Sequence, residues 1–145
     1  AVILCILLIN SNKKKKVIPN KESVLRWNST GITIAGVSTV SGTDNMHLNI
    51  PFDLALECKG TMFIADRNNH RIQKYARGSM NGMTVAGFGN GTSSTSLYGL
   101  NQAAHVIVDD EENLYIADAL NRRVLSWPRN ALSGVIVGGF GKKKS

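Results

Sequence analysis

Two ten-residue stretches decide the fold, Phe63-Ile-Ala-Asp-Arg-Asn-Asn-His-Arg-Ile72 and Tyr115-Ile-Ala-Asp-Ala-Leu-Asn-Arg-Arg-Val124. They begin 52 residues apart and belong to a longer repeat. When Leu48–Gly89 is laid on Leu100–Gly141 without gaps, 13 of the 42 positions are identical. Self-similarity at a fixed spacing predicts a repeat architecture, in which each copy forms one supersecondary unit.

Each copy of the repeat predicts four short strands. β-branched and aromatic residues fill short runs, and Gly, Asn, Asp and other turn-forming residues separate these runs. No stretch carries apolar residues at helical spacing over ten or more positions, so we predict an all-β chain. The expected strands are 53–57, 61–65, 71–75 and 83–86 in the first copy, and 105–109, 113–117, 123–127 and 135–138 in the second.

An earlier, incomplete copy precedes the two whole ones. Val24-Leu-Arg-Trp27 parallels Val124-Leu-Ser-Trp127, and Gly31-Ile-Thr-Ile-Ala-Gly36 parallels Gly82-Met-Thr-Val-Ala-Gly87. The sequence therefore contains two whole units and the second half of a third.

A four-stranded unit repeated about every 50 residues is typical of the blades of a β-propeller. The two opening stretches resemble the NHL repeat, whose signature is an aromatic-apolar-Ala-Asp turn followed by Asn-His-Arg-apolar. Leu48-Asn-Ile-Pro51 is similar to that family's entry into a blade, whereas Ala103 and Arg122 replace the family's usual Pro and His. The resemblance covers residues 20–141 and implies a partial β-propeller of four-stranded antiparallel blades.

The resemblance also implies a division of the chain. We expect an apolar, lysine-rich leader or degraded strand at residues 1–19, a partial blade at 20–45, NHL-like blades at 46–92 and 98–141, and a basic tail at 142–145. Propellers close with about four to eight blades. The chain is therefore expected to be a fragment completed by further blades of the same protein, or a unit completed by self-association.

The positive charge lies near the ends. The formal net charge is +7, and Lys13–Lys16 and Lys142–Lys144 supply seven of the 17 basic residues, leaving ten against ten acidic residues. The folded body is thus neutral, unlike that of most nucleic-acid-binding domains. The apolar run Ala1–Ile9 has two interpretations, the end of a membrane anchor or a buried strand, so the compartment stays open, with membrane-anchored and extracellular locations included.

Residues that recur in both copies are expected to serve the fold. An Asp at the end of a strand can accept hydrogen bonds from the following turn, Asn suits turn positions with unusual backbone angles, and Arg can pair with a nearby carboxylate. We predict structural turn roles for Asp66, Asn69, Arg71, Asp118, Asn121 and Arg123.

No pattern indicates catalysis. The glycines between 82 and 91 are not followed by a helix that could bind phosphate, and no Gly-x-Ser-x-Gly motif is present. His47, His70 and His105 lack the clustering of a metal site, and Cys5 and Cys58 are too few for a zinc site made of four cysteines. We predict no catalytic residue, no metal ligand and no cofactor.

Loop positions that differ between the copies are the predicted carriers of specificity. They are Arg67, Asn68, His70, Leu120 and Arg122, and the Ser- and Thr-rich stretch 89–99 with Tyr98 is a second possible contact. These residues lead us to expect a non-enzymatic module that presents its loops to a protein partner. Two alternatives remain open. One is an RNA-binding propeller that uses Arg67, Arg71, Arg122 and Arg123, as the basic faces of some family members imply. The other is part of a metal-dependent propeller enzyme, a lyase or a hydrolase.

Overall fold

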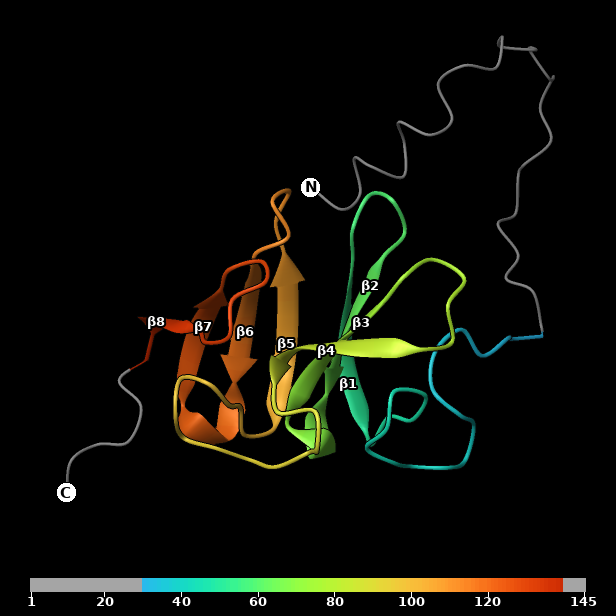
Figure 1. Cartoon of the computed structure of the whole chain (residues 1–145), viewed down its shortest axis with the longest axis horizontal. Coiled ribbons are helices and arrows are strands. Elements are labelled where there is room, and N and C mark those ends of the chain that lie inside the picture. Colours follow the sequence, from blue (N-terminus) through green and yellow to red (C-terminus); the bar gives the residue numbers. More distant parts are fainter. Residues whose placement is uncertain (1–29, 140–145) are drawn as a thin grey trace, which may run out of the picture.

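Two four-stranded antiparallel sheets make up the part of the chain that the structure, a computed structural model, describes, residues 30–139 (Figure 1). In both sheets the strands follow one another in sequence order. The first sheet contains β1 (Pro51–Leu56), β2 (Met62–Asp66), β3 (Arg71–Tyr75) and β4 (Gly82–Gly87), and the second contains β5 (Ala103–Val108), β6 (Leu114–Asp118), β7 (Arg123–Trp127) and β8 (Val135–Gly138).

The predicted all-β class is confirmed. Residues 30–139 contain no α-helix, only two 3₁₀ turns, η1 (Arg67–Asn69) and η2 (Ala119–Asn121). The expected bounds match β3, β7 and β8 and differ by one or two residues in the other five strands. None of these residues forms an apolar helix with the length of a membrane span.

The repeat extends to the irregularities of the two sheets. The register between β1 and β2 shifts between Pro51 and Asp53, and that between β5 and β6 shifts between Ala103 and His105. The third and fourth strands of both sheets also shift at matching positions, after Ile72 and after Val124. A β-bulge increases the local twist of a sheet, so these shifts give the two sheets the same shape.

One expectation about the turn after the second strand is wrong. Asn69 and Asn121 were expected to adopt unusual backbone angles, but the left-handed residues are the next ones, His70 with φ 52° and Arg122 with φ 54°. Asn69 and Asn121 are buried within the 3₁₀ turns, and their side chains donate hydrogen bonds to Asp66 and Asp118. The left-handed backbone conformation therefore falls on the residue that follows each Asn.

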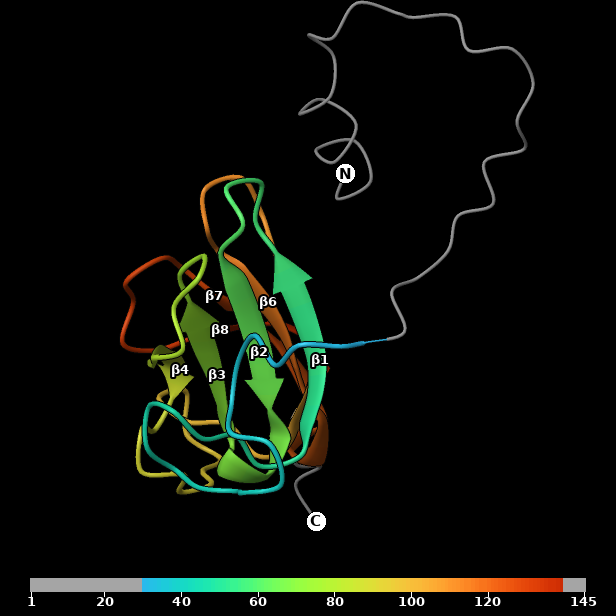
Figure 2. The same cartoon turned by 90° about the vertical axis from the view of Figure 1, so that its right-hand side faces the viewer.

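The two sheets are stacked with unlike faces in contact (Figures 1 and 2). We call the face with Phe63, Ala65 and Ile72 the front of the first sheet, and the face with Leu54, Met62 and Ile64 its back. The repeat partners Tyr115, Ala117 and Val124 define the front of the second sheet, and Val106, Leu114 and Ile116 define its back. The main core lies between the first front and the second back, where β5 contacts β1, β2 and β3.

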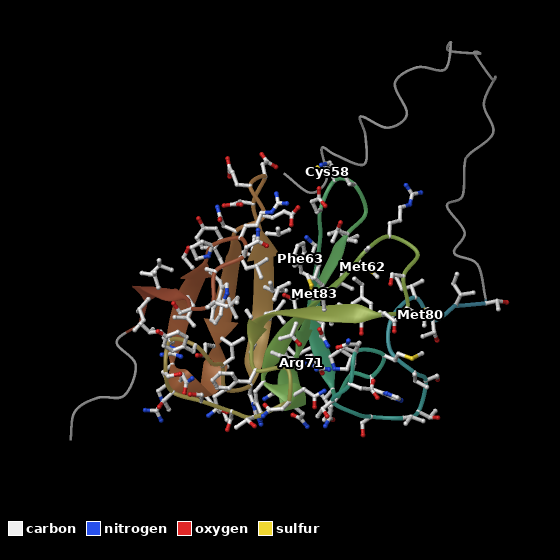
Figure 3. The ribbon with its side chains drawn as sticks, viewed as in Figure 1. Cys58, Met62, Phe63, Arg71, Met80 and Met83 are labelled. Carbon is white, nitrogen blue, oxygen red and sulfur yellow. The ribbon has the colours of Figure 1, made fainter. Side chains whose placement is uncertain are left out.

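A short segment before β1 covers part of the back of the first sheet. Ala35 and Leu48 pack on Met62, Ile64 and Tyr75, which form a second, smaller core. Met62 and Phe63 accordingly point to opposite sides of the first sheet (Figure 3). The rest of the predicted partial unit (residues 20–29), the predicted leader (1–19) and the predicted tail (142–145) lie outside the described residues.

Candidate functional site

A buried carboxylate organises the turn after β2. Asp66 Oδ1 accepts a hydrogen bond from the Asn49 backbone N at 2.7 Å. Asp66 Oδ2 accepts one from Asn69 Nδ2 and one from Arg71 Nε, each at 2.8 Å. Asp66 and Arg71 form a fully buried ion pair, so the nearby carboxylate that the sequence led us to expect for Arg71 is that of Asp66. A buried charge needs partners of this kind, because leaving it unpaired costs several kcal/mol.

The same network recurs around Asp118 in the second sheet. Asp118 Oδ1 accepts from the Asn101 backbone N at 2.7 Å, and Oδ2 accepts from Asn121 Nδ2 and Arg123 Nε at 2.8 Å. All six residues predicted to be structural turn residues therefore lie in one of two matching clusters.

Each arginine also holds the loop that leads into its sheet. The Arg71 guanidinium donates to the carbonyl oxygens of Thr43, Asp44 and His47. The Arg123 guanidinium donates to those of Thr95, Ser96 and Gly99, at positions 52 residues later. The structural repeat thus begins before Leu48, where Thr43 and Thr95 are identical but the next four aligned residues differ. Sequence comparison missed this part because a backbone carbonyl can be supplied by any residue.

Arg123 rigidly anchors the loop that carries Tyr98. Its Nη2 atom donates to Ser96 O at 2.6 Å and to Gly99 O at 3.1 Å, one on each side of Tyr98. Leu120 N donates to Asn101 O at 3.1 Å, which joins η2 to the same loop. The exposed side chains Tyr98, Leu120 and Arg122 lie on these two joined segments, and we call them the loop-end surface.

The other three predicted contact residues have partners within the chain. The Arg67 guanidinium lies 4.8 Å from the centre of the Phe52 ring, and His70 Nδ1 accepts a hydrogen bond from Gln102 N at 3.0 Å. Asn68 N donates to Asn49 O at 3.0 Å. Arg67 Nη2 also donates to Gln102 Oε1 at 3.4 Å, so Arg67 and His70 both join the first sheet to the start of the second. The structure therefore places Arg67 and His70 between the sheets and Tyr98, Leu120 and Arg122 on the loop-end surface, whereas Asn68 lies in the turn of the first unit at the position that Leu120 holds in the second.

The inner strands are also joined by polar contacts that sequence reasoning missed. Asp53 Oδ2 accepts a hydrogen bond from Val106 N at 3.0 Å and lies 3.3 Å from His105 Nδ1. Asp53 and His105 occupy the same position of the repeat. An acidic residue in one copy and a basic residue in the other is a sequence signal that could have indicated a contact between the two copies.

A second polar contact joins the two sheets at the ends of their strands that lie away from η1 and η2. Lys74 on β3 pairs with Glu112 in the turn between β5 and β6, and Arg129 Nη1 lies 3.7 Å from Glu112. The hydrogen bond from Lys74 lowers the pKa of the Glu112 carboxyl. Near the first sheet, the hydrogen bond from His47 likewise lowers the pKa of Asp44.

The arginines of the RNA alternative do not form an exposed patch. Arg71 and Arg123 are buried and donate to carbonyl groups, and Arg67 packs on Phe52. Arg71 and Arg123 are therefore not available as RNA contacts. Within residues 30–139, no group of three or more His, Cys, Asp or Glu side chains could hold a metal ion.

A scan against protein-family models and a search of curated proteins both return no match to this sequence.

Proposed function

We propose that the two sheets are successive blades of a β-propeller of the NHL type, and that the chain is a non-enzymatic module that binds a protein partner. The stacking of unlike faces supports the blade arrangement. A front-to-back contact is heterologous, because each unit uses one surface to bind the preceding unit and another to bind the next. Repeating such a contact by a rotation generates a ring.

The front of the second sheet supports the same arrangement. Ile107, Tyr115, Val124 and Val135 lie on this face and are exposed. Phe63 and Ile72, the repeat partners of Tyr115 and Val124, are covered by the second sheet. In the proposed propeller, a further blade covers this face in the same way.

The observation that carries the binding proposal is the fixed position of Tyr98. Tyr98 is 58% exposed, yet Arg123 holds the backbone carbonyls of Ser96 before it and Gly99 after it. Energetically dominant residues of protein interfaces are enriched in Tyr and Arg, and a loop whose backbone is already held in place loses less entropy on binding. The loop-end surface combines this tyrosine with Leu120 and Arg122, and it fits a peptide segment that has an apolar side chain and an acidic group.

The test is selection of a displayed peptide library on the whole chain, followed by affinity measurement with the selected peptides. Tyr98→Ala should weaken binding at least tenfold. Tyr115→Ala is the matched control, because Tyr115 is the same residue type and is exposed on the front of the second sheet, outside the loop-end surface. Equal binding by the wild type and Tyr98→Ala would refute the loop-end surface. Binding of RNA that falls steeply with salt and needs Arg122 would favour the RNA alternative instead.

A further inference from the structure

Two Asn-Gly pairs lie within residues 30–139, Asn81-Gly82 at the start of β4 and Asn90-Gly91 just after its end. In such a pair the main-chain nitrogen of the glycine can attack the side-chain amide of the asparagine, because glycine has no Cβ atom to hinder a close approach. Both asparagines are exposed. The sequence therefore makes the two pairs equivalent, and only their surroundings in the fold differ.

The Gly82 nitrogen is held inside the fold. It donates a hydrogen bond of 2.7 Å to the Asn45 carbonyl oxygen, at the short end of the range for N–H···O bonds. Gly82 is buried and pairs with Tyr75 as the first residue of β4. A nitrogen that keeps its proton in a short, buried hydrogen bond is a poor nucleophile, so the fold protects Asn81 from this attack.

The Gly91 nitrogen is held only by a turn. Asn90 and Gly91 lie in the connection between β4 and β5, which runs along one end of the two sheets (Figures 1 and 2). Gly91 N donates to Phe88 O at 3.2 Å, the long end of the same range, and this bond closes a β-turn outside the sheets. A bond of this kind opens locally at a lower free-energy cost than a bond at the buried edge of a strand.

The Asn90 side chain is already held beside that nitrogen. Its Oδ1 atom accepts a hydrogen bond from Thr92 N at 3.1 Å, the arrangement of an Asx turn, which folds the amide group back over the main chain of Gly91. The same bond polarises the Asn90 carbonyl, since the donor lies where negative charge develops when a nucleophile adds to Cγ. The bonds that Asn81 makes with Ser79 use main-chain atoms of Asn81 instead.

We propose that Asn90 is a site of spontaneous deamidation in the folded chain and that Asn81 is not. A base in solution removes the proton from Gly91 N, the nitrogen forms a bond to Asn90 Cγ, and the bond from Cγ to Nδ2 breaks as ammonia leaves with a proton from water. Water then opens the cyclic succinimide and gives aspartate or isoaspartate, with no change in oxidation state. The inference needs neither the blade arrangement nor a partner, so it is independent of the proposed function.

The modified residue lies between two fixed points of the connection. Arg71 Nη1 donates to Gly89 O at 2.9 Å, and Asn121 Nδ2 donates to Ser94 O at 2.8 Å. Deamidation places a negative charge between these points, and isoaspartate also adds a methylene group to the main chain there. We therefore expect the modification to rearrange residues 90–93 and to leave the buried networks of Asp66 and Asp118 in place.

The test compares the two asparagines within one molecule. The whole wild-type chain is incubated in mildly alkaline buffer with and without urea, digested at acidic pH, and analysed by tandem mass spectrometry, which assigns the mass gain to one asparagine or the other. In the folded chain, Asn90 should deamidate at least tenfold faster than Asn81. In urea the two rates should be similar, because both residues then precede an unprotected glycine.

Two variants complete the experiment. Asn90→Gln should remove most of the mass gain of the folded chain, and Asn81→Gln, the matched control, should leave it unchanged. Both variants alter exposed side chains, so the fold is expected to persist. Equal rates at Asn81 and Asn90 in the folded chain would overturn the proposal, as would an unmodified Asn90 in the folded chain under conditions that deamidate both residues in urea.

Discussion

Phe63 and Tyr115 occupy the same position of the repeat, but Phe63 is 2% exposed and Tyr115 is 41% exposed. The difference arises because the second sheet covers the front of the first, and nothing within residues 30–139 covers the front of the second. One sequence position therefore belongs to the core in one sheet and to the surface in the other. The same substitution can consequently be compared at a buried position in the first sheet and at its exposed repeat partner in the second.

Ile72 and Val124 provide the first such comparison. Ile72 is fully buried between the sheets, and Val124 is 38% exposed. Truncation of a buried Ile to Ala costs about 2–5 kcal/mol, because transfer energy is lost and a cavity forms. We expect Ile72→Ala to lower the free energy of unfolding by this amount and Val124→Ala by much less, as measured by urea unfolding. Equal losses would contradict the front-to-back stacking.

Arg123 should be far more important for stability than its neighbour Arg122. Replacing Arg123 with Met removes the partner of buried Asp118 and the donors that hold Thr95, Ser96 and Gly99. Breaking a buried ion pair from one side costs about 3–5 kcal/mol. The expected result is a large loss in the free energy of unfolding for Arg123→Met and almost none for Arg122→Met, which changes an exposed side chain. A small effect at Arg123 would show that the network contributes little to stability.

Gly87 should tolerate a methyl group less well than Gly78. Both glycines have positive φ, 81° and 77°, so Ala is strained at either position. A Cβ atom at Gly87 would collide with the backbone of His70 and Arg71, whereas a Cβ atom at Gly78 meets nothing within 4 Å. Thermal unfolding should therefore show a larger decrease in Tm for Gly87→Ala than for Gly78→Ala. Decreases of the same size would mean that the backbone relaxes around position 87.

The ion pair between Lys74 and Glu112 should make stability depend on pH. The pKa of Glu112 in the folded state is lowered from its ordinary value of 4.5, chiefly by the hydrogen bond from Lys74. A lowered carboxyl pKa contributes stability that is present above the unfolded-state value and is lost as the pH falls through the folded-state value. Urea unfolding at a series of pH values below 4.5 should show a steeper loss for the wild type than for Glu112→Gln.

Glu111→Gln is the control for the pH series, because Glu111 is the exposed neighbour in the same turn. It should keep the pH dependence of the wild type. If Glu112→Gln and the wild type lose stability in parallel, the contact between Lys74 and Glu112 does not contribute to the acid response.

The strands and the repeated turns could be predicted from sequence because their causes are local. Alternating apolar residues and turn-forming residues lie within one stretch of chain, and Asp66 and Arg71 are only five residues apart. The anchoring of the Tyr98 loop could not be predicted in the same way. Its acceptors are backbone carbonyls 24–28 residues from Arg123, and every residue type supplies such a group.

The amino-acid sequence by itself determined the all-β class, the four-stranded unit and its 52-residue spacing, because each of these follows from local patterns that occur twice. Only the tertiary structure decided which side chains of those patterns are buried and which are exposed. Arg67 and His70 are predicted contact residues, and only the structure shows that they also link the two sheets. The physical reason is that the exposure of a residue depends on what is stacked against its face, and identical local sequences carry no information about their neighbours in space.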